Sequence, residues 1–213
     1  MERWERYAPL TGVVAVVLWI AGIFLLEKDD RPDGKDTAAF VRWVEANDSS
    51  ILAGAIIFGF GVLFFLWMLG SLRATLTAAE GGPARLAILT FASGLAVSIS
   101  LMFTYLPHAQ AAFDHENTSD TAIESLVRVG DAFFGGAALF AIPMLVALAI
   151  SIVRFGALPR WLAWFSLGVA VVLVIPPLAF FGLVLGLPLW TLAVSFLVWK
   201  RQAGEPAAAP PPA

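Results

Sequence analysis

Five long apolar runs, each without Asp, Glu, Lys, Arg or His, alternate along the chain with segments that carry the charges. A hydrocarbon core about 30 Å thick is crossed by about 20 apolar residues of helix. Each run reaches that length, so the pattern predicts helices that span a membrane. The runs are Tyr7–Leu26, Ile51–Leu72, Leu86–Pro107, Ala132–Val153 and Trp161–Trp199.

The fifth run is long enough for two crossings. Its 39 residues would form about 58 Å of helix, and two prolines and two glycines near its middle are helix breakers. We therefore predict a reversal between residues 175 and 186. The fold class that follows is an all-α, polytopic bundle of six transmembrane helices. The predicted spans are about 7–26, 51–72, 86–107, 130–153, 159–178 and 181–201.

The connection between the first two spans also contains a helical pattern. Asp36 or Thr37 can cap a short helix over residues 37–47. We expect this helix to lie on the membrane surface or to roof the bundle, and Trp43 is a residue typical of membrane interfaces. The apolar face of the predicted helix consists of Phe40, Val41 and Val44.

These elements form a single transmembrane domain over residues 1–201. The remaining residues, 202–213, are rich in Ala and Pro and contain one acidic residue. Such a segment cannot bury enough apolar surface to fold, so we predict a disordered tail.

The charges predict an orientation. If the N-terminus lies inside, the inner segments hold eight of the 13 Lys and Arg residues and four of the 16 Asp and Glu residues. The inner side then carries a net +4 and the outer side −7. Because Lys and Arg near the ends of spans favour the cytoplasmic side, the bias of eight to five predicts N-in/C-in topology. We therefore expect a multi-pass protein of the cell membrane with both termini in the cytoplasm.

Several function classes conflict with the composition. The chain has no cysteine, which excludes disulfides, thiolate metal sites and thiol redox chemistry. The apolar runs carry no charge, whereas ion-coupled transporters and voltage sensors keep charged residues inside the membrane. The two histidines lie away from mid-membrane, which argues against a haem with two intramembrane ligands. No basic patch indicates a nucleic-acid partner, and we expect no cofactor.

A stripe of hydroxyl side chains follows one face of the third predicted span. Its residues are separated by offsets of three, seven and four, which places them on one side of a helix. Such a seam can line a polar path, or it can serve helix packing, since Ser and Thr let membrane helices approach and hydrogen-bond. We call this stripe the hydroxyl seam; it consists of Thr90, Ser93, Ser100 and Thr104, and His108 extends it.

A second group of polar residues gathers around the second outer connection. Two imidazoles and three carboxylates could together hold zinc or a similar ion. However, the group lacks the helical spacing of histidine and carboxylate ligands that a zinc site uses. We therefore expect no metal site. If a metal ion were bound, its candidate ligands would be His108, Asp114, His115, Glu116 and Asp131.

Two segments of the chain resemble a known class of protein. Residues 65–76 read Phe-Leu-Trp-Met-Leu-Gly-Ser-Leu-Arg-Ala-Thr-Leu and close the second span, and residues 158–164 read Leu-Pro-Arg-Trp-Leu-Ala-Trp and begin the fifth. With the order of elements along the whole chain, they resemble small six-span integral membrane proteins of GC-rich bacteria. The resemblance implies a fold, and it carries over no activity or site residue because those families are domains of unknown function.

The function that these observations favour is non-enzymatic. We expect an accessory or structural membrane protein that binds lipid, binds another membrane protein or associates with itself. One alternative is a small transporter or channel for an apolar or weakly polar solute, with the hydroxyl seam as its path. Another is an outer-face enzyme that modifies lipid, with His108 and Asp131 as acid and base.

Overall fold

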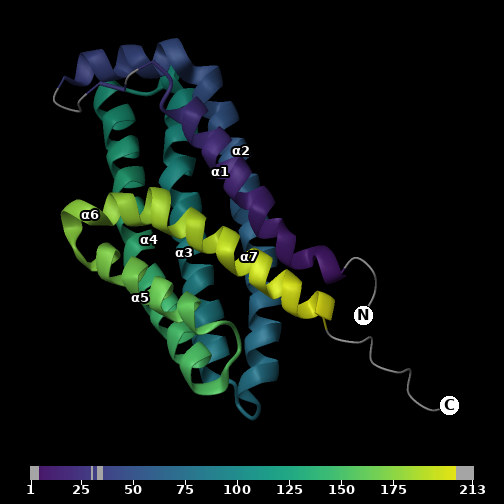
Figure 1. Ribbon diagram of the computed structural model, residues 1–213. Coiled ribbons are helices and arrows are strands. Elements are labelled where there is room, and N and C mark those ends of the chain that lie inside the picture. Colours follow the sequence, from purple (N-terminus) through teal and green to yellow (C-terminus); the bar gives the residue numbers. More distant parts are fainter. Residues whose placement is uncertain (1–4, 30, 33–35, 205–213) are drawn as a thin grey trace.

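The computed structural model describes residues 5–29, 31–32 and 36–204, and all regular elements in these ranges are helices (Figure 1). The longest of them run up and down, so that their connections alternate between two ends of the bundle. In order the elements are the 3-10 helix η1 (Glu5–Leu10), α1 (Thr11–Leu26), α2 (Thr37–Glu80), α3 (Arg85–Phe113), the 3-10 helix η2 (His115–Asn117), α4 (Asp120–Phe155), α5 (Arg160–Val174), α6 (Pro176–Phe181), the π-helix η3 (Gly182–Gly186) and α7 (Leu187–Gly204).

The surface of the bundle suits a membrane. Among the described residues, five helices are long and apolar enough to cross one. Large apolar side chains are exposed on their outer faces, among them Phe24 at 76% and Leu139 at 69%. Exposed apolar surface of this extent is unfavourable in water and favourable against lipid. The all-α prediction is confirmed, and the chain is a helical integral membrane protein.

The connections divide between two ends of the bundle. The His108 end holds the connections α1–α2 and α3–α4, and the Glu80 end holds α2–α3 and α4–α5 (Figure 1). The helix η1 packs against α7, so both ends of the described chain lie together toward the Glu80 end.

The helix predicted over residues 37–47 is the first part of α2 and not a separate element. Asp36 caps it as predicted, since its Oδ1 accepts a hydrogen bond from the Ala39 N–H at 3.0 Å. This part crosses the His108 end of the bundle before α2 turns to run along α1 and α3 (Figure 1). The sequence between it and the second apolar run is polar but contains no helix breaker, so the helix continues through it.

The fifth apolar run reverses at its first proline, at one edge of the predicted window. Ile175 separates α5 from α6 with extended backbone angles, φ −90° and ψ 106°, as the residue before a proline prefers. The glycines at 182 and 186 bound η3, which continues α6 into α7 without a turn. The predicted spans 159–178 and 181–201 are therefore corrected to helices over 160–174 and 176–204.

The helix α5 is short for a crossing. Its 15 residues extend about 22 Å, less than a hydrocarbon core of about 30 Å. The returning helix begins with α6, which places Phe180 against Phe134 of α4, with ring centroids 6.0 Å apart. Phe134 lies near the start of the fourth apolar run. The hairpin of α5 and α6 thus reaches the edge of the apolar region but stays below the connections of the His108 end (Figure 1).

Two helices extend past their predicted ends. The helix α3 continues through Pro107 to Phe113, which places His108 inside a helix. The helix α7 continues to Gly204, so residues 202–204 are helical and not part of a tail. The rest of the predicted tail, 205–213, lies outside the described residues.

The hydroxyl seam faces the interior of the bundle. All four of its side chains are buried, with relative exposures from 1% to 8%. The Thr104 hydroxyl donates to the Ser100 carbonyl at 2.9 Å. A Cβ placed on Gly136 of α4 would lie 3.5 Å from the Ser100 hydroxyl, so Ser100 is part of the contact between α3 and α4.

Ser100 is expected to tolerate enlargement poorly. We predict that Ser100→Leu lowers the free energy of unfolding by about 1 to 3 kcal/mol, because the extra carbons have to fit between α3 and α4. The neighbouring Ile99 is 50% exposed, and Ile99→Leu should have little effect. Thermal unfolding in one detergent compares the two variants, and equal midpoints would show that the seam does not need small side chains.

Candidate functional site

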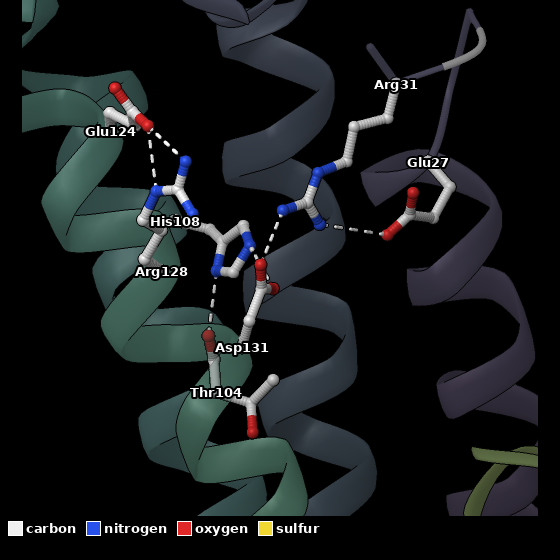
Figure 2. Close-up of polar contacts among 7 residues, drawn as sticks. All are labelled: Glu27, Arg31, Thr104, His108, Glu124, Arg128 and Asp131. Carbon is white, nitrogen blue, oxygen red and sulfur yellow. Dashed lines mark hydrogen bonds and ion pairs between the residues drawn. The ribbon is translucent and has the colours of Figure 1, made fainter. Parts of the chain in front are cut away.

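Polar side chains from three helices meet at one level of the membrane. Glu27, His108 and Asp131 each stand directly beside the end of an apolar run, the first, the third and the fourth. They therefore mark the boundary at which hydrocarbon gives way to lipid headgroups. Figure 2 shows Glu27 and Asp131 beside Arg31, which follows α1, and His108 on the other side of Asp131.

The first part of α2 holds the segment that carries Arg31. Trp43 donates its indole N–H to the carbonyl of Lys28 at 2.9 Å. The Arg31 guanidinium carbon lies 5.5 Å from the ring centroid of Phe40, in cation–π geometry. Trp43 is buried, at 7% exposed, so its ring packs inside the protein at the His108 end.

Asp131 joins this segment to the helix pair α3 and α4. Its Oδ2 accepts a hydrogen bond from Arg31 Nη2 at 2.8 Å, and its Oδ1 lies 3.6 Å from His108 Nε2 (Figure 2). Arg31 Nη1 also lies 3.7 Å from Glu27 Oε1. In space, acidic and basic side chains therefore alternate in a row, in the order Glu27, Arg31, Asp131 and His108.

The ring of His108 has a fixed orientation. Its Nδ1 lies 2.8 Å from the carbonyl oxygen of Thr104, which can only accept a hydrogen bond, so Nδ1 carries the proton in this contact. Nε2 is then the ring atom that faces Asp131, and it attracts the carboxylate when it also carries a proton. Gly130 makes this arrangement possible. A Cβ at residue 130 would lie 2.3 Å from the Thr104 carbonyl oxygen and 2.8 Å from His108 Nδ1.

A second ion pair lies farther from the apolar region on α4. Glu124 accepts a hydrogen bond from Arg128 Nε at 2.8 Å, a favourable i,i+4 pair on one helix. It also accepts one from the Thr37 hydroxyl at 2.6 Å, which ties α4 to the start of α2. Hydrogen bonds from the Thr37 hydroxyl first and from Arg128 second lower the pKa of the half-buried Glu124 carboxyl below its usual value.

The charged residues border a cavity of about 490 Å³, which we call the polar cavity. It lies between the end of α1, the helices α3 and α4, and the segment α6–η3. Apolar side chains close its other side. Its polar wall consists of Glu27, Arg31, Thr104, Tyr105, His108 and Asp131.

A second cavity, of about 390 Å³, adjoins it toward the middle of the membrane, and we call it the apolar cavity. It lies between α1, α3 and the segment η3–α7, and its lining is almost entirely apolar. The two cavities share four lining residues, so they are direct neighbours, one with a polar wall and the other with an apolar lining. The shared residues are Ile23, Tyr105, Phe134 and Val184.

The candidate residues from the sequence separate into two groups. His108 and Asp131 meet, and Thr104 of the hydroxyl seam joins them at the polar cavity. His115 instead turns its Nδ1 to the Ala112 carbonyl at 2.8 Å. Among the residues that the structure describes, no group of three or more His, Cys, Asp or Glu side chains could hold a metal ion.

Three residues of the site were missing from the sequence prediction, namely Glu27, Arg31 and Tyr105. Glu27 could have been found from its place beside an apolar run, the property that it shares with His108 and Asp131. Arg31 and Tyr105 have no comparable signal. Arg31 lies in an irregular segment, and Tyr105 lies one helical turn before His108 inside an apolar run.

Comparison of the chain with protein-family models, with curated proteins and with solved structures finds no match in any of the three. The resemblance to small six-span bacterial membrane proteins therefore stays a prediction. The chemistry of the site has to be inferred from its own geometry.

Gly130 offers a direct test of how tightly this geometry is held. We expect Gly130→Ala to lower the free energy of unfolding by about 1 to 3 kcal/mol, because its methyl group would collide with the Thr104 carbonyl and the His108 ring. Gly135→Ala on the same helix is the control, since no atom lies within 4 Å of its added Cβ. Thermal unfolding of both variants checks the prediction. A Gly130→Ala protein as stable as the control would mean that α3 and α4 are not closely packed at His108.

Proposed function

We propose that this protein is a non-enzymatic membrane protein that binds one membrane lipid in the neighbouring polar and apolar cavities. The observation that carries the proposal is their shared lining, which joins charged groups at the headgroup level to an apolar space beside the hydrocarbon. A lipid has the same division into a polar and an apolar part. The volumes, about 490 and 390 Å³, both fall within the range of small-molecule sites, roughly 300 to 1,000 Å³.

Access from the bilayer supports the same proposal. Ile20, Phe24, Leu185 and Leu189 line the apolar cavity and are also exposed on the outer surface of the bundle. The cavity therefore borders the surface that faces lipid. An acyl chain could enter between α1 and α7 without passing through water.

The wall formed by η3 also suits a binding site. Three residues of this π-helix, Leu183, Val184 and Leu185, line the apolar cavity. Short π-helical segments inside α-helices occur frequently at functional sites. Here η3 lies between α6 and α7, at the point where the chain borders both cavities.

Binding is favoured over acid–base catalysis on lipid. Asp131 Oδ2 accepts a hydrogen bond from Arg31 at 2.8 Å, and Oδ1 lies 3.6 Å from His108 Nε2, too far for a hydrogen bond between the acid and the base of that alternative. The other nitrogen of His108 is engaged by a backbone carbonyl. Such a network positions charges, whereas a general base needs a free oxygen or nitrogen within reach of its substrate. The transport alternative relies on the whole hydroxyl seam, of which only Thr104 contributes to the two cavities.

We further propose six crossings with both termini in the cytoplasm. The count treats α5 as the fifth crossing and the continuous helix α6–η3–α7 as the sixth, because the chain reverses between them at Ile175. The orientation rests on the excess of Lys and Arg in the segments of the Glu80 end.

The orientation can be tested with single cysteines, since the chain has none of its own. We expect a membrane-impermeant maleimide to label Asn117→Cys in intact cells, because residue 117 lies in the connection between α3 and α4. Thr77→Cys, at the opposite end of the bundle, should be labelled only after permeabilisation. The reverse pattern would contradict the N-in orientation.

Filling the apolar cavity tests lipid binding. Val184 lines both cavities, so the larger side chain of Val184→Trp should fill part of the space for the lipid. We expect the lipid that remains bound after purification to fall about tenfold, which corresponds to a loss of about 1.4 kcal/mol in binding free energy. Val171→Trp is the matched control, because Val171 is 60% exposed on α5 and lines neither cavity. Native mass spectrometry of both variants measures the bound lipid. Equal retention by the two proteins would mean that lipid binds elsewhere on the surface.

A further inference from the structure

We infer that the bound lipid has a headgroup with an ammonium group, which lies in the polar cavity beside Glu27 and Asp131. This inference rests on the lipid site proposed above and adds the chemical class of its ligand. Three features of the polar cavity carry it: its balance of charge, its aromatic rings and its level in the membrane.

The charge balance of the polar cavity is negative. Its lining includes two carboxylates, Glu27 and Asp131, and one guanidinium, Arg31. These three groups sum to −1. A proton on His108 Nε2 would face Asp131 and not Glu27, so the surroundings of Glu27 do not depend on it. The guanidinium is already engaged, because Asp131 accepts its hydrogen bond at 2.8 Å. A headgroup with only negative charge would add repulsion here, and it would have to compete with Asp131 for Arg31.

Glu27 is the carboxylate best placed to receive a cation. It lies 3.7 Å from Arg31 Nη1, a longer distance than that between Arg31 and Asp131. Its side chain is 49% exposed, so part of the carboxylate remains open to a ligand. An ammonium group beside this carboxylate would form an ion pair with it, and one with N–H donors would also form a charge-assisted hydrogen bond.

Aromatic rings provide the second feature. Tyr105, Phe134 and Phe180 line the polar cavity, and the last two have ring centroids 6.0 Å apart. Ring faces attract ammonium groups, whether or not these carry N–H donors. An anionic headgroup gains no such attraction, so the rings favour the same class of ligand as the carboxylates.

The third feature is the level of the site. Glu27 and Asp131 lie at the ends of apolar runs, where a headgroup lies in the bilayer. The apolar cavity continues from this level past Tyr105 and Phe134 toward the membrane centre. The ammonium group and the acyl chain of one lipid can therefore occupy both cavities in the orientation that the lipid has in the membrane.

The experiment compares three lipids with identical acyl chains on the purified full chain. Phosphatidylethanolamine and phosphatidylcholine carry ammonium groups, whereas phosphatidylglycerol does not. We expect each of the first two to bind roughly tenfold more tightly than phosphatidylglycerol in native mass spectrometry. This is the gain in affinity typical of one contact between opposite charges, here between the ammonium group and Glu27. Glu27→Gln should reduce this preference to within about threefold. Glu45→Gln is the control, since it removes the same charge from an exposed position on the first part of α2.

The outcomes separate the two proposals. If the wild-type chain binds phosphatidylglycerol as tightly as the other two lipids, and Val184→Trp weakens all three, the ammonium inference is wrong and the lipid site stands. If Val184→Trp leaves the binding of every lipid unchanged, the lipid site itself is wrong. If Glu45→Gln changes the preference as much as Glu27→Gln, the preference arises from overall charge, which also overturns the inference. The wild-type comparison decides the question even if a variant fails to fold.

Discussion

The site depends on the carboxylate of Asp131, because it joins α4 to α3 through His108 and to the segment after α1 through Arg31. A charged group in the middle of the hydrocarbon would be costly, and such residues are rare there. Asp131 avoids most of this cost because it stands at the end of an apolar run and its side chain stays 50% exposed. Its pairing with Arg31 offsets a further part. The chain can therefore hold charges directly beside an apolar cavity, the combination that an amphiphilic ligand requires.

The position of Asp131 depends in turn on how closely α3 and α4 approach. Gly130, the residue before it, lies against the Thr104 carbonyl and the His108 ring, where a larger side chain would separate the two helices. Small residues serve close packing between membrane helices in general. At this contact the close packing also sets the distance between an imidazole and a carboxylate. Packing and electrostatics are thus determined by the same residue.

The apolar pattern predicts the fold class and most helices, because a helix in hydrocarbon has to satisfy its own backbone hydrogen bonds over the whole thickness of the core. The boundaries are less well predicted. The helix α2 runs through the polar stretch at 47–50 because no proline or glycine interrupts it, and α3 runs through Pro107. For the site, the sequence analysis named His108 and Asp131, which stand beside the ends of apolar runs, and the same criterion would have identified Glu27. Arg31 is placed by long-range contacts, the Trp43 hydrogen bond to Lys28 and the ring of Phe40, and no local pattern records these contacts.

The cavities follow from a detail that the sequence leaves open, namely the place at which the fifth apolar run reverses. A break at Gly182 or Gly186 would have placed residues 176–181 at the end of α5, and only α7 would then return past α1. Because the chain reverses at Ile175, before Pro176, the segment α6–η3 instead lies along the two cavities and places Phe180 on Phe134 and Val184 between both cavities. Proline fixes the break because the residue before it disfavours helical angles, whereas glycine in a membrane helix is tolerated. The difference between these two kinds of helix breaker therefore determines whether this bundle has a space for a ligand.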